Sequence, residues 1–293
     1  MKKKTVGQIV LLVVLTVLAV VCFLPMLLVV AASFSSDHSL RVKGFSFVPL
    51  EWSTEGWEYV LSMGSQLLLS YRNTICITIV GTGVSLFFMS MLAYALSHRN
   101  FVLRKALSIL LLGTMLFSGG QLSHYMINTT VYHLKDNMLI LFLPAISAMH
   151  VIILRTYIQG NIAEALVESA KIDGAGEFRI YAQVVMPLLL PALASVGFMV
   201  AIGYWNNWET GYLYIKTQDK LPLQTLLMQI EKKIEMLNNP NMNDAVAAQM
   251  WETVPEISAR MAMLVTVIGP IMIAYPFFQK YFVQGLTVGS VKG

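Results

Sequence analysis

Charged residues are scarce in this chain of 293 residues: Asp, Glu, Lys and Arg together make up only 12% of it, whereas a soluble domain carries about 25%. Hydrophobic residues make up 56%, and the mean hydropathy is +0.66. Such a composition indicates an integral membrane protein. The net charge of +4 comes without a basic cluster interleaved with aromatic residues, so it does not indicate a nucleic-acid partner.

Cysteine and histidine are also scarce, and their positions form none of the common chemical sites. Cys22 and Cys76 lie inside apolar runs, so they make neither a disulfide framework nor a metal cluster. The histidines, at positions 38, 98, 124, 133 and 150, form no H-E-x-x-H or related pair. An enzyme would need a nucleophile and a base, or a set of metal ligands, at reachable spacing. We therefore expect no catalytic residue, no metal site and no cofactor in this chain.

Long apolar runs, in contrast, are abundant, and a bilayer requires about 20 such residues per helix. Six candidates lie at residues 8–33, 73–97, 106–125, 138–159, 188–205 and 261–282. The third contains FSGGQLSHY, where we expect a break that faces protein or a cavity, because lipid does not tolerate bare backbone. The first exceeds the apolar core of a signal peptide, about 7–15 residues, which favours a retained anchor over a cleaved signal. Without a fixed-period repeat, one membrane domain over residues 1–293 is the simplest prediction.

Lysine and arginine in the short loops set the expected orientation. The lysines at positions 2–4 precede the first run, and a second basic group at residues 99–105 follows the second run. Because such residues gather on the cytoplasmic side, six spans place both termini and the loop at about residues 160–187 in the cytoplasm. The segment at about 206–260 then lies outside, where we expect an extracytoplasmic helical lobe with helices at 223–237 and 244–251.

The loop between the fourth and fifth runs is charged and broken by glycine. In NIAEALVESAKI, Ile162, Leu166 and Ala170 repeat every four residues, which predicts a short amphipathic helix. Asp173-Gly174 ends that helix, because glycine accepts a positive φ, and a second helix follows in AGEFRIYAQVVM. Small residues around the turn let a partner approach the backbone closely. A plain connector would also need a turn and polar residues, so these features alone leave both interpretations open.

A more specific pattern runs through the same loop. Glu168, Ala170 and the Asp173-Gly174-Ala175 turn precede VVMP at the spacing of E-A-A, D-G-A and I-x-L-P in ABC importer permeases. The loop resembles the EAA loop of that family, with Ser169 in place of the middle alanine. RNTICITIVGT, FLPAISAMHVIILRTYIQ, YWNNWETGYLYIKTQDKLPLQTLL and FFQKYFVQGLTVGSVKG also resemble its carbohydrate-importing branch, in particular the second membrane subunit of maltose-type systems. Together they cover most of the chain from about residue 70.

The resemblance implies an all-α type I ABC importer permease fold with a cytoplasmic EAA coupling helix. It implies a heterodimer with a second permease, an ATP-binding cassette ATPase dimer that carries ATP and Mg, and an extracytoplasmic solute-binding protein. Such a complex imports an oligosaccharide across a bacterial cytoplasmic (inner) membrane. This chain agrees in lacking a G-x-x-x-x-G-K-[ST] phosphate loop. The residues that the resemblance assigns to ATPase coupling are Glu168, Ser169, Ala170, Asp173, Gly174 and Ala175.

The outer segment WNNWETGYLYIKTQDKLPLQ combines aromatic residues with amides. This chemistry stacks on sugar faces, but an interfacial aromatic belt or a docked partner explains the aromatic residues without any ligand, and that interpretation is favoured. The expected belt residues are Trp205, Trp208, Tyr212 and Tyr214. The candidate contacts with the substrate path or the binding protein are Asn206, Asn207, Trp208 and Glu209.

The alternative from another class is a secondary, ion-coupled transporter. Such proteins carry ionisable residues in mid-membrane, often in paired repeats with interrupted helices. Here His150 and Arg155 are the nearest cases. Arg155 is expected at the cytoplasmic end of its helix, where its charge can reach the interface, and His150 is expected in helix packing or a polar path rather than a proton relay.

Overall fold

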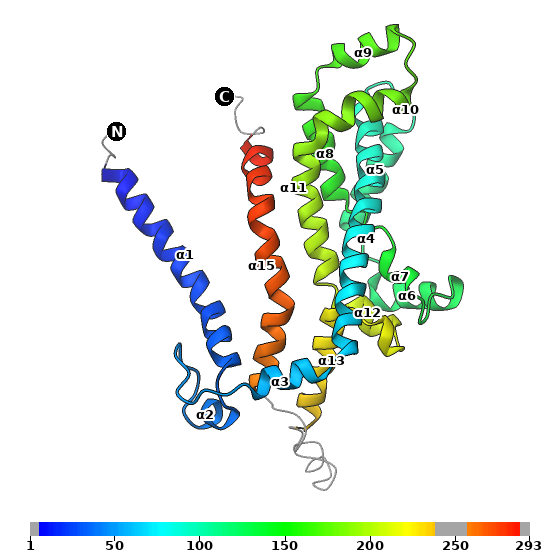
Figure 1. The fold of residues 1–293 in the computed structure, drawn as a ribbon. Helices are drawn as coiled ribbons and strands as arrows, with labels where there is room; N and C mark the ends of the chain where they lie inside the picture. The colour runs from blue at the N-terminus through cyan, green and yellow to red at the C-terminus, as the bar shows by residue number, and fades with distance from the viewer. Residues whose placement is uncertain (1–5, 238–256, 288–293) are drawn as a thin grey trace. The chain divides into compact units, whose positions relative to one another are not determined.

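The structure, a computed structural model, describes residues 6–237 and 257–287. Over these residues the chain is helical apart from its connections and one isolated bridge between Ser35 and Trp52. This confirms the predicted all-α class (Figure 1). The chain divides into two compact units, Met1–Leu68 with Leu226–Pro270 and Leu69–Thr225 with Ile271–Gly293. That residues 1–293 act as one membrane domain stays a prediction.

The first unit contains three helices before residue 65: α1 (Val6–Ser33), α2 (Asp37–Val42) and α3 (Glu55–Ser62). It is held together by close contacts around residue 258. A Cβ on Gly56 would lie 2.5 Å from the carbonyl carbon of Ser258, so only glycine fits there. The Ser258 N–H donates to Asp37 Oδ1 over 2.7 Å. The start of α15 is thereby fixed against α2 and α3.

The helices after residue 64 follow in this order: α4 (Ser65–Ser97), α5 (Arg104–Leu116), α6 (Gly120–Met126), α7 (Leu139–Phe142), α8 (Ala148–Asn161), α9 (Glu164–Ile172), α10 (Glu177–Ile180), α11 (Met186–Trp205), α12 (Trp208–Tyr214), α13 (Leu223–Leu237) and α15 (Ile257–Thr287). The bounds of α13 agree with the predicted helix at 223–237. The predicted helix at 244–251 lies outside the described residues.

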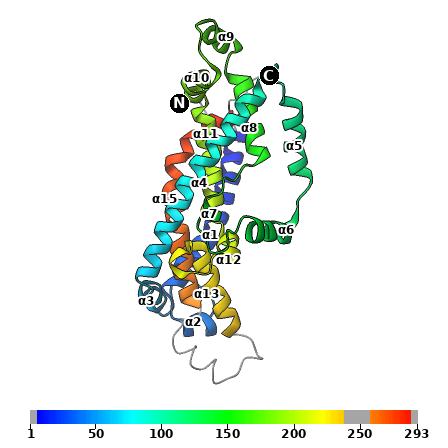
Figure 2. The ribbon, with the colours of Figure 1, turned by 90° about the vertical axis from the view of Figure 1, so that its right-hand side faces the viewer.

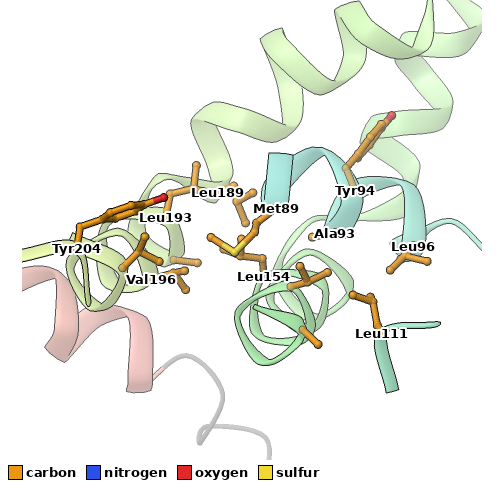
Figure 3. Packing of buried hydrophobic residues seen from close by; sticks show 14 of the residues in the cluster. Met89, Ala93, Tyr94, Leu96, Leu111, Leu154, Leu189, Leu193, Val196 and Tyr204 are labelled. Atoms are coloured by element: carbon orange, nitrogen blue, oxygen red, sulfur yellow. The ribbon is translucent and has the colours of Figure 1, made fainter. Parts of the chain in front are cut away.

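The core of the second unit lies where α4, α8 and α11 meet. Met89, Leu154 and Leu189 are fully buried there, and Figure 3 shows their side chains pointing toward one another. In a membrane this packing is driven by van der Waals contact rather than by exclusion of water, because lipid tails are as apolar as the side chains.

Four of the described helices are long and apolar enough to cross a membrane: Gly7–Ser33, Ser65–Ser97, Glu177–Trp205 and Ile257–Phe277. They correspond to the first, second, fifth and sixth predicted spans. The third is a pair of helical segments, Arg104–Leu116 and Gly120–Val131, bent by 115° at the predicted FSGGQLSHY break. The chain therefore crosses the membrane several times.

The fourth predicted span, residues 138–159, is not one helix. It is broken between α7 and α8 at Pro144, because a residue before proline is pushed toward extended backbone, and Leu143 has φ −56° and ψ 134°. The exposed backbone groups find partners in side chains. Tyr204 donates its hydroxyl to the Leu143 carbonyl over 2.7 Å, and Ala145 N–H donates to Ser85 Oγ over 2.9 Å. Because these hydrogen bonds are internal, the break meets the condition for non-helical backbone within a bilayer.

Candidate coupling site

Helix α9 and the turn after it form the predicted coupling element. Figures 1 and 2 both place α9 beyond the ends of α8 and α11, at the opposite end of this unit from α12. The helix ends at Ile172, and its cap Asp173 is followed by Gly174 with φ +78°, as the Asp-Gly pair predicted. Figure 1 shows α9 as a short helix separate from the long ones. It is therefore at an end of the second unit, where a partner can reach it.

The turn is a Schellman motif, a common way to end a helix with glycine. Ala175 N–H donates to the Ala170 carbonyl, and Gly174 N–H donates to the Lys171 carbonyl, each over 3.0 Å. Ala170 and Ala175 both pack against the hydrophobic core of the unit. The motif thus satisfies two carbonyls that would otherwise be unpaired at the helix end, and it anchors the turn through two small side chains.

The polar surface of the turn faces away from that core. Glu168, Ser169, Asp173 and Gly174 are exposed. Apart from Gly174 and its two neighbours in the chain, no residue has an atom within 4 Å of the position that a Cβ on Gly174 would occupy. The structure therefore brings the predicted residues together on one short element, with Ala170 and Ala175 inward and the other four outward.

One carboxylate, Glu177 at the start of α10, links this element to α4. Its Oε1 lies 2.6 Å from Lys171 Nζ, and its Oε2 accepts a hydrogen bond from the Tyr94 hydroxyl over 2.9 Å. His98 Nε2 lies 3.7 Å from Oε2, which is too far for a hydrogen bond. Burial lowers the pKa of His98, which favours the neutral form of its ring.

A cavity of about 880 Å³ lies beside α9. Its lining includes Glu164 and Glu168 from α9, Arg99 from the connection after α4, and Arg104, the first residue of α5. Charges of both signs therefore line one hollow at the predicted cytoplasmic end. Among the residues that the structure describes, no group of three or more His, Cys, Asp and Glu is placed to hold a metal ion.

The second predicted site lies at the start of α12. Asn207 caps this helix by accepting a hydrogen bond from Thr210 N–H over 3.0 Å. Asn206 Oδ1 accepts one from Gln224 over 3.0 Å, and Glu209 accepts one from Gln121 of α6. The polar side chains of this site are therefore engaged within the protein.

Trp208 presents the aromatic surface of the same site. It is 39% exposed and meets Tyr212, which is 40% exposed, edge to face with ring centroids 6.2 Å apart. Trp205 and Tyr214, which the sequence placed in the same belt, are buried instead. The aromatic surface available to a ligand, a lipid or a partner at this point is thus the Trp208–Tyr212 pair.

Comparisons with known proteins decide the family. Over 280 residues the chain is 36% identical to the polygalacturonan/rhamnogalacturonan transport system permease protein YtcP of Bacillus subtilis. The aligned region covers 95% of this chain and 96% of YtcP. This chain belongs to the carbohydrate ABC importer permeases. The permease is also 35% identical over 276 residues to protein LplC of Bacillus subtilis, across 93% of this chain and 90% of LplC. No protein-family model matches it.

A solved structure is also similar to the permease. It is described as a bacterial ABC transporter involved in the import of the acidic polysaccharide alginate. The TM-score is 0.78 at 28% sequence identity, over 96% of this chain and 100% of that one. The permease is therefore a membrane-spanning transport subunit, and the family decides against the ion-coupled transporter that the sequence left as an alternative.

The permease contains site residues that the sequence did not single out. Lys171, Glu177 and Tyr94 form the polar link described above. The separation of six positions between Lys171 and Glu177 gave no helical signal, because the turn lies between them. Tyr94 reaches Glu177 only through the folding of α4 against α10, so sequence spacing could not have identified it.

Proposed function

We propose that this permease forms a heterodimer with a second permease and imports an oligosaccharide through the path between them. An extracytoplasmic solute-binding protein delivers the sugar. ATP, with Mg²⁺, is hydrolysed on a separate dimer of ATP-binding cassette subunits, because this chain has no phosphate loop of its own. The relatives named for polygalacturonan, rhamnogalacturonan and alginate transport support a saccharide of more than one unit as the substrate class.

The coupling residues are Glu168, Ser169, Ala170, Asp173, Gly174 and Ala175, and their partner is the ATPase dimer. The observation that carries this assignment is the Schellman turn. It fixes Gly174 at φ +78° with open space around its Cα, so a partner surface can meet the backbone directly. Glu168 lines the charged cavity beside α9, where a cation on the ATPase can pair with its carboxylate.

Two substitutions at Gly174 test the coupling assignment. Gly174→Asn keeps a residue that tolerates positive φ and adds a small side chain, whereas Gly174→Trp adds a bulky one. We expect Gly174→Trp to abolish sugar uptake and copurification of the ATPase subunits, with normal membrane insertion, and Gly174→Asn to retain both in part. Normal uptake and normal ATPase copurification in the Trp variant would contradict the assignment.

The orientation belongs to the same proposal: a multi-pass protein of the bacterial cytoplasmic membrane, with both termini and the α9 loop in the cytoplasm. The basic residues near the N-terminus and after α4 support it. A cysteine at Gly176, in a chain whose Cys22 and Cys76 are replaced by alanine, tests it. An impermeant maleimide should label this cysteine in inverted vesicles and not in intact cells; the reverse pattern would refute the orientation.

The outer site, Asn206, Asn207, Trp208 and Glu209, is assigned to the entrance of the path. Because its amide and carboxylate oxygens are engaged within the protein, we assign the contact with an incoming partner to the Trp208 ring and its neighbour Tyr212. Docking of the binding protein suits this exposed aromatic pair, since aromatic residues are enriched at the centres of protein interfaces.

A further inference from the structure

The connection between α2 and α3, residues 44–52, exposes an unusual amount of apolar surface. The exposed fractions are 52% for Phe45, 56% for Phe47, 66% for Val48, 57% for Leu50 and 73% for Trp52. Single exposed apolar residues are normal on proteins, but a contiguous group of them marks a contact surface. We call residues 44–52 the interfacial loop.

The charged residues at the two ends of the interfacial loop bind one another. Glu51 accepts a hydrogen bond from Lys43 Nζ over 2.8 Å and one from Ser36 Oγ over 2.9 Å. These bonds, the Lys43 bond first, lower the pKa of Glu51 to about 2, so its carboxylate stays charged. The tip between them, GFSFVPL, carries no charge. The loop therefore has a polar base and an apolar tip.

Backbone hydrogen bonds fix the base of this loop at the end of α1. Ser36 N–H donates to the Glu51 carbonyl over 2.9 Å, and Ser53 N–H donates to the Phe34 carbonyl over 3.0 Å. Helix α1 ends at Ser33, directly before this pairing. In Figure 1 the interfacial loop turns back toward that end of α1. Its position is thus set relative to a membrane span in the same compact unit.

The depth of the loop follows from chain geometry. Leu50 and Trp52 are each one residue from the paired Glu51, and extended chain spans at most about 3.6 Å per residue. The headgroup region on each side of the hydrocarbon core is about 5–8 Å deep. When α1 spans the hydrocarbon core of the bilayer, the side chains of Leu50 and Trp52 therefore lie within the headgroup region.

We propose that the interfacial loop inserts its apolar side chains into the headgroup region of the bilayer beside α1. A lipid partner is favoured over a protein partner for two reasons. The base of the loop is hydrogen-bonded to the residues directly after α1, and the most apolar window of α1 has no buried residue in this chain and so is available to lipid. Its side chains are Phe, Trp, Val and Leu with no charge at the tip, and Trp in particular concentrates at membrane interfaces. The proposal goes beyond the proposed transport function and holds for either orientation of the chain.

Fluorescence quenching in the assembled importer tests this contact. Single cysteines at Phe47 and at Leu50, in a chain with Cys22 and Cys76 replaced by alanine, are labelled with an environment-sensitive dye. A cysteine at the exposed Glu55, the first residue of α3, is the control. The complex is reconstituted into nanodiscs of phosphatidylcholine and phosphatidylglycerol, with and without phosphatidylcholine that carries a nitroxide on its headgroup.

We expect the labels at Phe47 and Leu50 to be quenched by the nitroxide lipid several-fold more than the control label, and several-fold less by iodide in the buffer. Equal iodide quenching at all three positions would place the loop in water and overturn the proposal. Protection from iodide without quenching by the nitroxide lipid would mean that a protein subunit covers the loop, which would also overturn it. Two loop positions guard against a single substitution that disturbs the fold.

Discussion

At the scale of single residues, one carboxylate outside the sequence motif links the predicted coupling loop to α4. Glu177 holds Lys171 of α9 on one oxygen and Tyr94 of α4 on the other. The side chains of Lys171 and Glu177 are 44% and 60% exposed, so their ion pair contributes at most about 1 kcal/mol to stability. Its consequence is therefore positional: it connects a movement of α9 to the end of a membrane span.

A charge exchange separates this positional role from a purely structural one. We expect Glu177→Lys to lower the amount of sugar transported per ATP hydrolysed several-fold, because α9 loses its link to α4. The double variant Lys171→Glu with Glu177→Lys should recover part of that ratio, since the ion pair is restored. The measurement is coupled uptake and ATPase activity in proteoliposomes. If the double variant were no better than Glu177→Lys alone, the ion pair would not position the loop.

Asp136 is a residue whose ionised carboxylate ties the connection before α7 to the connection after α12. Its side chain accepts hydrogen bonds from the Thr217 hydroxyl and from the N–H groups of Thr217 and Lys216. These bonds, the Thr217 hydroxyl first, hold the pKa of Asp136 well below its usual range. A carboxyl with a depressed pKa in the folded state stabilises the fold above its unfolded pKa of about 4 and loses that contribution as the pH falls further.

Replacement of Asp136 should show this pH dependence directly. We expect Asp136→Asn to lower the melting temperature in detergent at neutral pH, and the difference from the native chain to shrink progressively below about pH 4. Tyr132→Phe, in the same connection, serves as the control. A difference between Asp136→Asn and the native chain that stayed constant with pH would show that ionisation of Asp136 is not the source of its effect.

At the scale of elements, the sequence predicted the helix ends and breaks that depend on neighbouring residues. It missed the break that depends on contacts between residues distant in the chain. The Asp173-Gly174 turn, the bounds of α13 and the break in the third span all follow from residues adjacent in sequence. The break in the fourth span has a local signal in Pro144. Whether a proline kinks a helix or divides it depends on partners for the freed backbone groups, and here the partners, Tyr204 and Ser85, are about 60 residues away.

The Tyr204 hydroxyl is therefore expected to stabilise the break between α7 and α8. Tyr204→Phe leaves the Leu143 carbonyl without this donor, at a cost of roughly 0.6 kcal/mol and at most about 1.7 kcal/mol for a hydrogen bond within a membrane protein. Gly81 permits the contact, since a Cβ there would lie 2.6 Å from the Tyr204 ring. Unfolding in a denaturing detergent measures the loss. Tyr157→Phe on α8 is the control, and an equal effect of both substitutions would refute the role of the Tyr204 hydroxyl.

At the scale of the whole molecule, the two candidate sites lie at opposite ends of the second unit, with α9 at one end and α12 at the other (Figures 1 and 2). An importer driven by ATP needs one end to meet the ATPase and the other to meet the arriving sugar. The long helices α4 and α11 run between the two ends and are packed together with α8 through Met89, Leu154 and Leu189. Tightly packed helices of this kind carry displacements as rigid elements, so a change at one end can reach the other.

Substitution of the exposed aromatic pair tests whether the α12 end receives the binding protein. We expect the double substitution Trp208→Ala with Tyr212→Ala to raise about tenfold the concentration of sugar-loaded binding protein that half-maximally stimulates ATPase activity. This change corresponds to a loss of ~1.4 kcal/mol in binding free energy, a modest value for an exposed aromatic contact. Basal ATPase activity should be unchanged, because α9 is at the other end of the unit. The measurement is ATPase activity of the reconstituted importer against binding-protein concentration. If the variant were stimulated over the same range of binding-protein concentration as the native chain, and if nitroxide lipid quenched Trp208 in the native chain, the pair would belong to an interfacial belt instead.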